Sequence, residues 1–408
     1  MSDPVDSVPP LARTPEEWTK AIAPLGGRAF HARQVFRWLQ ARSVFEPAKM
    51  TDLPAALRAK LDALEMPRTI EVTDERRAAD DTRKLLVRMK DGATVETVLI
   101  PGVTGPKGQL PAPVDAGSEG AMEAADDDED DAADDEDARG GARRASGTAG
   151  GFEPIRVTQC ISTQVGCAMG CIFCASGVAG LKRHLGADEI VAQVLAGRAR
   201  LDEGERLSNV VYMGMGEPLA NYENTARSLR LLTHGEGIGL SLRRISVSTS
   251  GLVPEIARLG EDFGGKVGLA ISLHAADDET RTRLMPINRK YPLARLMEAL
   301  RAYPLPPRRR ITIEYTLVAG KNDDVAEARK LVRVLRGLPV KVNLIPMNPI
   351  EASTLGPPEM RGVLAFQRVL CDAGYSCFIR RRRGDDVAAA CGQLALLGAK
   401  PKVRVDRS

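Results

Sequence analysis

The sequence is poor in aromatic residues and has no long hydrophobic run. Only 4% of its 408 residues are Phe, Trp or Tyr, although 43% are hydrophobic, a composition typical of a soluble globular protein. No stretch of about 18 uncharged apolar residues occurs, so we expect no transmembrane helix. The start, Met1 to Asp6, lacks a basic segment followed by an apolar one, and we therefore expect no signal peptide.

Cysteine is scarce and unevenly distributed. The chain has seven cysteines, an odd number, and all of them lie at or after Cys160. A secreted disulfide framework normally uses an even number of cysteines in a small domain, so we do not expect one here. The pattern favours a reducing, cytoplasmic location, with at most a transient catalytic disulfide.

The charge is nearly balanced overall but strongly uneven along the chain. Between Asp115 and Asp137 lie 13 acidic residues and no Lys or Arg, and removing them from the net charge of +3 leaves +16. Basic clusters occur elsewhere, at Lys182–Arg183, Arg243–Arg244, Arg308–Arg310 and Arg380–Arg383. Each cluster could be an ordinary hydrated surface, but together they favour a polyanionic partner such as RNA.

The region before residue 102 predicts two small units. Residues 14–65 read as a helical accessory domain, with Thr14 as a candidate N-cap. One expected helix places four apolar residues near one face, namely Phe30, Val35, Phe36 and Leu39. Residues 66–101 change to short strands and form a β extension, with a hairpin signal at Asp91-Gly92.

Residues 102–153 lose this apolar periodicity. Gly, Pro, Ala and acidic residues dominate, and no aromatic residue appears before Phe152. Such a segment cannot bury enough apolar area to offset the entropy of ordering it, so we predict a disordered acidic insertion.

Strands and helices alternate over residues 154–395. The expected strands are 155–160, 208–213, 244–249, 267–273, 311–317, 340–345 and 375–380. The expected helices between them are 187–203, 223–233, 292–303, 323–336 and 358–373. Repeated βα units predict an α/β fold whose parallel strands form a full or partial barrel, with its chemistry at the carboxyl ends of the strands.

Three cysteines crowd into eight residues of this region, at Cys167, Cys171 and Cys174. A structural zinc site needs four closed ligands, whereas three thiolates on a [4Fe–4S] cluster leave one iron free for another ligand. The spacing, with Phe173 directly before the third cysteine, resembles the signature of the radical S-adenosylmethionine enzymes. In those enzymes the open iron binds the amino and carboxylate groups of S-adenosylmethionine.

Polar or glycine-rich turns follow several expected strands. Gly216 allows close backbone approach to a ligand, and Glu217 could accept a hydrogen bond from the amino group of a cofactor. Each such residue could be an ordinary turn or capping residue, but their shared position at strand ends favours a cavity for a polar ligand. The candidate cofactor-binding residues are Gly216, Glu217, Ser248, Ser272, Leu273, His274 and Asn348.

The remaining cysteines differ in setting. Cys371 lies among apolar helix residues and Cys377 alternates in a strand, so we expect both to be core residues. Cys391 precedes a glycine in a polar tail, where a loop can carry its thiol into an active site. Cys160 ends the strand before the three-cysteine motif and is also expected near that site.

Taken together, these motifs resemble the radical S-adenosylmethionine adenine methyltransferases of the RlmN/Cfr type. The similarity covers nearly the whole chain outside the first dozen residues, the 102–153 insertion and the last few residues. Its segments are Phe30–Trp38, Val95–Pro101, Cys167–Cys174, Gly214–Leu219, Ser248–Gly251, Ser272–Ala275, Leu344–Pro349 and Gly384–Leu394. Met347 departs from the family pattern, because many members have Trp at this place.

The resemblance implies a partial (βα)6 barrel that methylates C2 of an adenine in 23S rRNA, with two S-adenosylmethionine molecules used per turnover. One methylates the thiolate of Cys391, and the other is cleaved at the [4Fe–4S] cluster to supply a radical. The thiolate of Cys160 then releases the protein–RNA adduct as a disulfide. Glu96 matches the proton acceptor of the family, although the strand pattern alone suggests an ordinary exposed glutamate.

Two other functions stay open on the sequence. One is methylation of adenine at C8 by a member of the same family, and the other is a non-catalytic RNA-binding protein with a structural metal site. The pair Cys160 and Cys391 argues against the second, because binding alone needs no methyl-carrying and resolving thiols. The resemblance further implies tRNA as a candidate second substrate, an electron donor such as flavodoxin, no membrane partner and a monomeric state.

Overall fold

The computed structural model describes residues 8–63, 69–102, 154–350, 353–380 and 382–394. The predicted acidic insertion lies outside these residues, apart from Gly102 at its start. Within the described part of the chain, no helix is both long and apolar enough to cross a membrane.

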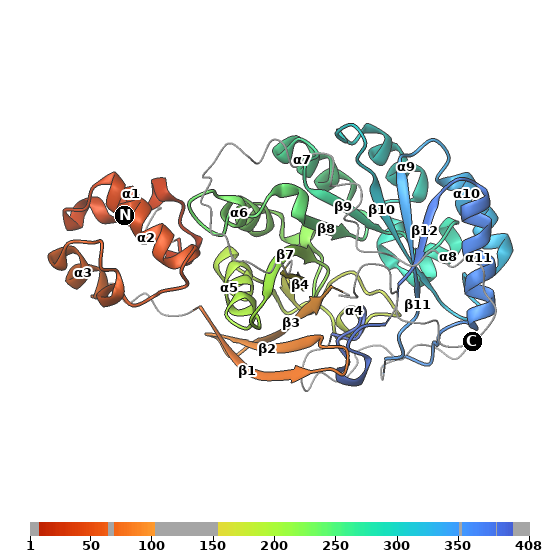
Figure 1. Ribbon diagram of the computed structural model, residues 1–408. Helices are drawn as coiled ribbons and strands as arrows, with labels where there is room; N and C mark the ends of the chain where they lie inside the picture. Colours follow the sequence, from red (N-terminus) through yellow and green to blue (C-terminus); the bar gives the residue numbers. More distant parts are fainter. Residues whose placement is uncertain (1–7, 64–68, 103–153, 351–352, 381, 395–408) are drawn as a thin grey trace, which may run out of the picture.

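Residues 14–63 form a small helical unit with its own buried side chains (Figure 1). Its helices are α1 (Pro15–Ile22), α2 (Ala29–Gln40) and α3 (Ala55–Asp62). Thr14 starts α1 as predicted, because its hydroxyl accepts the Glu17 N–H at 3.3 Å and its own N–H donates to the Glu17 carboxylate at 2.9 Å. Trp18 and Phe36 are fully buried in this unit.

The prediction for Phe30 was wrong. Val35, Phe36 and Leu39 are buried, whereas Phe30 is 52% exposed. Five residues along an α-helix correspond to a rotation of about 500°, so Phe30 points about 140° away from Val35. The buried face of α2 instead includes His31 and Ala32.

The β extension forms an antiparallel meander of β1 (Ile70–Arg77), β2 (Arg83–Met89) and β3 (Thr94–Pro101). The predicted turn between β2 and β3 is confirmed, with Gly92 at φ +81° and its N–H donating to the Met89 carbonyl at 3.0 Å. β3 then pairs antiparallel with β4 (Ile155–Cys160), so the extension continues the sheet of the next unit.

Seven parallel strands curve into a partial barrel within the described residues. After β4 they are β7 (Glu205–Tyr212), β8 (Ile245–Thr249), β9 (Gly268–Ser272), β10 (Ile311–Leu317), β11 (Val340–Pro346) and β12 (Ser376–Ile379). The sheet runs in chain order from β1 to β12, leaving out the short pair β5 (Gln164–Val165) and β6 (Arg183–His184). Six βα repeats followed by β12 therefore confirm the predicted α/β partial barrel (Figure 1).

Helices cover the outside of these strands. They are α5 (Ala187–Arg198), α6 (Tyr222–Thr233), α7 (Val253–Phe263), α9 (Leu293–Ala302), α10 (Val325–Val334) and α11 (Met360–Asp372). The sequence analysis missed α7 and two shorter helices, α4 (Ala175–Ala179) and α8 (Asp278–Leu284). The helical unit contacts α6 through a bidentate Arg227–Glu17 ion pair at 2.8 and 2.9 Å.

Candidate functional site

The three clustered cysteines lie in the loop between β5 and α4, which we call the cysteine loop (residues 166–174). Gly166 begins it at φ +79°, and a Cβ there would stand 1.9 Å from the Gly180 carbonyl oxygen, so only glycine fits. The Phe173 ring packs edge-on against His274 with centroids 4.8 Å apart. This contact holds the loop against the carboxyl end of β9.

The thiols of the cysteine loop lie close enough to influence one another. Burial raises the pKa of Cys171 well above its usual value, and the neighbouring Cys174 and Cys167 raise it further. Burial also raises the pKa of Cys167 to about 12. Cys171 and Cys174 keep some solvent exposure as residues, but the protein around their thiols removes most of the water. Three buried thiolates would therefore require a strong positive charge between them.

The donor set fits an iron–sulfur cluster better than a single metal ion. Within the residues that the structure describes, no group of three His, Cys, Asp or Glu side chains is arranged to hold one metal ion. In a cubane each thiolate ligates a different iron, so the ligands are spread more widely than around one ion. Three thiols also leave the fourth iron open to a further ligand.

The turn after β7 places Glu217 at the carboxyl ends of the parallel strands, which we call the barrel mouth. Gly216 has φ +104°, and a Cβ there would meet the Gln164 side chain at 2.6 Å. The Glu217 carboxylate accepts the Ser250 N–H at 2.7 Å and the Leu219 N–H at 3.1 Å. Burial nevertheless raises the pKa of Glu217, with these backbone donors opposing the rise. Glu217 thus fixes the turns after β7 and β8.

Ser248 and Ser272 end neighbouring strands, and their hydroxyl oxygens lie 3.4 Å apart. The next residues, Leu273 and His274, are buried. His274 has a positive φ of 56°, and its Nδ1 accepts the Thr316 N–H at 2.8 Å. Burial, and secondarily Arg281, lowers the pKa of His274 to about 3, so its imidazole is neutral near pH 7.

Arg281 on α8 was not predicted as a site residue, yet its side chain bonds to the turns that follow β8 and β9. It is fully buried and donates to the Ser250 carbonyl at 2.7 Å and to the Leu273 carbonyl at 3.1 Å. A third bond, of 2.9 Å, goes to the Asn288 side chain. No local pattern marks Arg281, because it lies in a short helix that periodicity did not reveal.

On the other side of the mouth, the structure brings Cys160 and Cys391 together. Burial raises the pKa of Cys160 to about 12, with the nearby Cys391 adding to the rise and Arg380 opposing it. Burial likewise raises the pKa of Cys391. The neighbouring Glu314 and Cys174 raise this pKa further, whereas Arg380 lowers it. Cys391 is exposed as a residue and lies within electrostatic reach of Cys174 in the cysteine loop.

Cys391 lies on a segment that we call the tail loop (residues 382–394). Asn348, after β11, donates to the Cys391 carbonyl at 3.0 Å. The Ala175 N–H donates to the Gly392 carbonyl at 2.8 Å, and the Ser176 hydroxyl donates to the Leu394 carbonyl at 2.6 Å. These bonds hold the end of the tail loop against the start of α4, directly after Cys174.

Glu96 is not the exposed glutamate that the strand pattern alone suggested. It lies on β3 with only 8% of its surface exposed, and its carboxylate pairs with the Lys84 ammonium at 3.0 Å. The Ser162 hydroxyl donates to its backbone carbonyl at 2.7 Å. β3 pairs with β4, with Val98 opposite Cys160, which places Glu96 in the strand next to the one that carries Cys160.

Of the other two cysteines, one was placed wrongly. Cys377 is 1% exposed on β12, as predicted, whereas Cys371 is exposed. Cys371 lies in the last turn of α11, where the helix end leaves it open to solvent.

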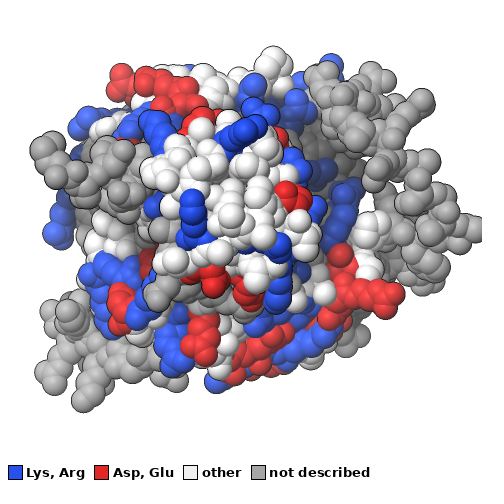
Figure 2. All heavy atoms as spheres, turned by 90° about the vertical axis from the view of Figure 1, so that its left-hand side faces the viewer, with Lys and Arg blue, Asp and Glu red and all other residues white. Residues whose placement is uncertain are grey.

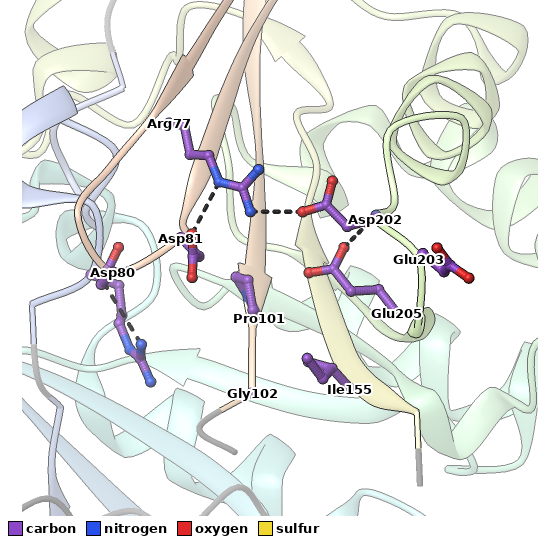
Figure 3. Close-up of a pocket in the computed structure, with 10 residues that line it drawn as sticks. Arg77, Asp80, Asp81, Pro101, Gly102, Ile155, Asp202, Glu203 and Glu205 are labelled. Carbon is purple, nitrogen blue, oxygen red and sulfur yellow. Dashed lines mark hydrogen bonds and ion pairs between the residues drawn. The ribbon is translucent and has the colours of Figure 1, made fainter. Parts of the chain in front are cut away.

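A polar pocket of about 420 Å³ lies beside the start of the tail loop (Figure 3). Its lining residues are Arg77, Asp80, Asp81, Pro101, Gly102, Ile155, Asp202, Glu203, Glu205 and Arg383. Arg77 pairs with Asp202 at 2.7 Å and with Asp81 at 3.0 Å, so several of its carboxylates are already neutralised. None of the candidate thiols lines it, and the chemistry is therefore not expected there.

Comparison with known proteins agrees with this geometry. Residues 161–332 match the radical SAM superfamily, and residues 12–66 match the ribosomal RNA large subunit methyltransferase N-terminal domain. The chain is 67% identical to the dual-specificity RNA methyltransferase RlmN of Sorangium cellulosum, over 97% of both chains. It is 41% identical to the protein of that name from Syntrophobacter fumaroxidans, over 93% of this chain and 94% of the relative.

A solved structure extends the match to three dimensions. The crystal structure of a radical SAM methyltransferase from Sphaerobacter thermophilus superposes with a TM-score of 0.78 at 39% identity, covering 95% of this chain and 99% of that one. Full-length similarity, both domain matches and the three-cysteine loop at a partial barrel lead to one conclusion. The chain belongs to the RlmN family of radical SAM RNA methyltransferases.

Proposed function

We propose that this enzyme methylates C2 of an adenine in 23S rRNA and accepts tRNA as a second substrate. The observation that carries the proposal is the 2.8 Å bond from the Ala175 N–H to the Gly392 carbonyl, which joins the residues next to Cys174 and Cys391, with Cys160 within electrostatic reach of Cys391. The relatives are named dual-specificity RNA methyltransferases, which supports a substrate range of this kind.

The cofactor side of the proposed site consists of the cysteine loop and the strand-end turns. Cys167, Cys171 and Cys174 ligate a [4Fe–4S] cluster. When bound, this cluster and S-adenosylmethionine supply an organic radical by one-electron reduction of the sulfonium. The residues proposed to hold S-adenosylmethionine are Gly216, Glu217, Ser248, Ser272, Leu273, His274 and Asn348.

The other residues of the proposed site, Cys391, Cys160 and Glu96, transfer the methyl group. Adenine C2 is too weak a nucleophile to displace a methyl group directly from a sulfonium. We propose that Cys391 first carries the methyl group on its sulfur, so that two S-adenosylmethionine molecules are used per turnover. After the methyl carbon has joined the base, the thiolate of Cys160 attacks the Cys391 sulfur. A disulfide forms as the sulfur–carbon bond breaks, and the electron pair of that bond stays with the methylene carbon on the base, which takes up a proton to complete the methyl group. Before this step the methyl carbon would have given one hydrogen atom to the organic radical, and Glu96 would have taken up the proton leaving C2 while one electron passed back to the cluster.

The thiol environment supports this division of labour. The raised pKa of Cys160 keeps its thiol protonated and unreactive near neutral pH, and the adjacent Arg380 favours its thiolate. Cys391 shares Arg380, so one cation serves both sulfurs in turn.

The helical unit is proposed to be an RNA-binding accessory domain. Phe30 is exposed on α2 between two exposed arginines, Arg28 and Arg33, a combination suited to base stacking with phosphate contact. Figure 2 shows Lys and Arg side chains distributed over this side of the molecule, with acidic side chains among them. Some basic residues instead serve the protein itself: Arg183 pairs with Asp91 and Glu189.

The remaining features of the proposal rest on the family alone. The enzyme acts as a monomer in the cytoplasm and receives electrons from a donor such as flavodoxin.

Mass spectrometry of nucleosides from ribosomal RNA tests the reaction. A strain that lacks the gene should lose 2-methyladenosine from its 23S rRNA and regain it when the gene is restored. Loss of 8-methyladenosine instead would favour the C8 alternative. An unchanged nucleoside profile would support the non-catalytic RNA-binding alternative.

A further inference from the structure

Lys84 on β2 contacts both halves of the proposed transfer site. Its Nζ lies 3.0 Å from Oε1 of Glu96, and both side chains are nearly buried, with exposed fractions of 11% and 10%. The same Nζ donates to the carbonyl oxygen of Ala388 at 3.2 Å. Ala388 belongs to the tail loop and precedes Cys391 by three residues. An ammonium has three donors, so one group can hold both acceptors at once.

In the middle of the tail loop, the Ala79 N–H donates to the Asp386 carboxylate at 3.1 Å, and Lys84 adds the contact at Ala388. At its start, Asp80 accepts the Gly384 N–H at 3.2 Å, and at its end Asn348 donates to the Cys391 carbonyl. Between these tethers Ala388 adopts φ +51°, a left-handed conformation that residues with a Cβ rarely hold without support. The bond from Lys84 reaches the carbonyl of this strained residue.

We propose that Lys84 is a positioning residue that sets the proton acceptor Glu96 and the methyl-carrying Cys391 at a fixed separation. The functional half of this inference rests on the roles proposed above for Glu96 and Cys391. A nearly buried lysine must be paired, and Lys84 pairs with Glu96 and with the loop that carries Cys391. Removing the ammonium therefore takes away the bond to Ala388 and the ion pair to Glu96, while the other bonds of the tail loop remain.

The first test measures how well the tail loop holds Cys391, without using catalysis. Full-length protein with a reconstituted cluster is treated with iodoacetamide, and alkylation of Cys391 is compared by peptide mass spectrometry with that of exposed Cys371 in the same molecule. In Lys84→Met the Cys391:Cys371 rate ratio should rise about tenfold, the effect expected for losing a charge-assisted hydrogen bond.

The control is Arg88→Met, on the same strand. Arg88 pairs with Glu71, and both side chains are largely exposed, so its loss should leave the ratio unchanged. Lys84→Gln, which keeps a neutral donor, should give an intermediate ratio and also covers the case in which Lys84→Met folds poorly. A ratio in both Lys84 variants equal to that of the wild type would overturn the inference.

The second test separates positioning from general damage. With 23S rRNA and S-adenosylmethionine, Lys84→Met should retain wild-type RNA affinity and iron content, while methylated RNA per iron falls about tenfold. Lys84→Arg, which restores a cation, should recover part of the loss. An equal loss in Lys84→Arg and Lys84→Met, with normal alkylation in both, would contradict a positioning role.

The two tests also distinguish this inference from the proposed function. Faster alkylation of Lys84→Met, combined with no RNA methylation by the wild-type chain, would refute the function and retain the loop contact. Normal alkylation and normal methylation by Lys84→Met would refute the inference alone.

Discussion

The cysteine loop and the tail loop bring thiols to the same barrel mouth in different ways. The cysteine loop takes its three thiols from eight consecutive residues, and a glycine turn with the Phe173–His274 contact fixes it locally. The tail loop supplies one thiol, and bonds from β2, the β11 end and α4 hold it in place. Local spacing therefore identifies the proposed cofactor half of the site, whereas the proposed transfer half is assembled only by tertiary contacts.

The largest expected effect comes from removing the three thiols of the cysteine loop. Reconstituted wild-type protein should carry about four irons, and replacing Cys167, Cys171 and Cys174 together with Ala should remove them along with all S-adenosylmethionine cleavage. Cys371→Ala serves as the control, because that exposed thiol lies on the outer helix α11. Full iron content in the triple variant would contradict the cluster assignment.

Replacing Cys391 and replacing Cys160 should block the reaction at different steps. Cys391→Ala removes the methyl acceptor, so no label from methyl-labelled S-adenosylmethionine should reach protein or RNA. Cys160→Ala keeps loading and addition but lacks the releasing thiolate, and should accumulate a nuclease-sensitive protein–RNA adduct on a denaturing gel.

Iron content separates these outcomes from misfolding, since both variants keep the cysteine loop and should retain their iron. Normal turnover by Cys160→Ala, or RNA methylation by Cys391→Ala, would show that this chain does not use the two-thiol mechanism.

The smallest expected effect concerns His274, in the turn after β9, and is a change in how the free energy of unfolding depends on pH. His274 takes up its proton near pH 3 in the folded state but near pH 6.5 when unfolded, so its contribution to stability falls as pH drops below about 6.5. Asn tolerates the positive φ and can still accept the Thr316 N–H, without titrating.

His274→Asn should therefore lose less stability than the wild type between pH 7 and pH 5, measured by thermal unfolding. Parallel pH curves for the two proteins would mean that the buried imidazole does not contribute to acid destabilisation.

The sequence predicted the parallel strands well, because short segments rich in Val, Ile and Leu, such as 340–345 and 311–317, are mostly buried. It missed α7, where Pro254 and Gly260 mask the helical period. It misplaced Phe30 and Cys371, because both lie near helix ends where an apolar face is poorly defined.

For the candidate site, spacing was enough to find the cysteine loop, and the family resemblance supplied Glu96. Neither pattern pointed to Lys84 or Arg281. A lysine in an alternating strand and an arginine in a short helix look like surface residues, and only the fold brings them to buried acceptors. Residues that connect distant segments leave no local signal in one sequence.

The order of strands in the sheet has a further consequence, for self-association. Without the extension, β4 would be the outermost strand of the barrel and would present unpaired backbone groups beside an apolar surface, a template for aggregation. With the extension, β1 is the edge strand of the sheet. The second half of β1 is the charged run Asp74–Arg77, which is exposed throughout. The segment that carries Glu96 thus also ends the sheet in a strand whose exposed, hydrated side chains disfavour pairing with further chains.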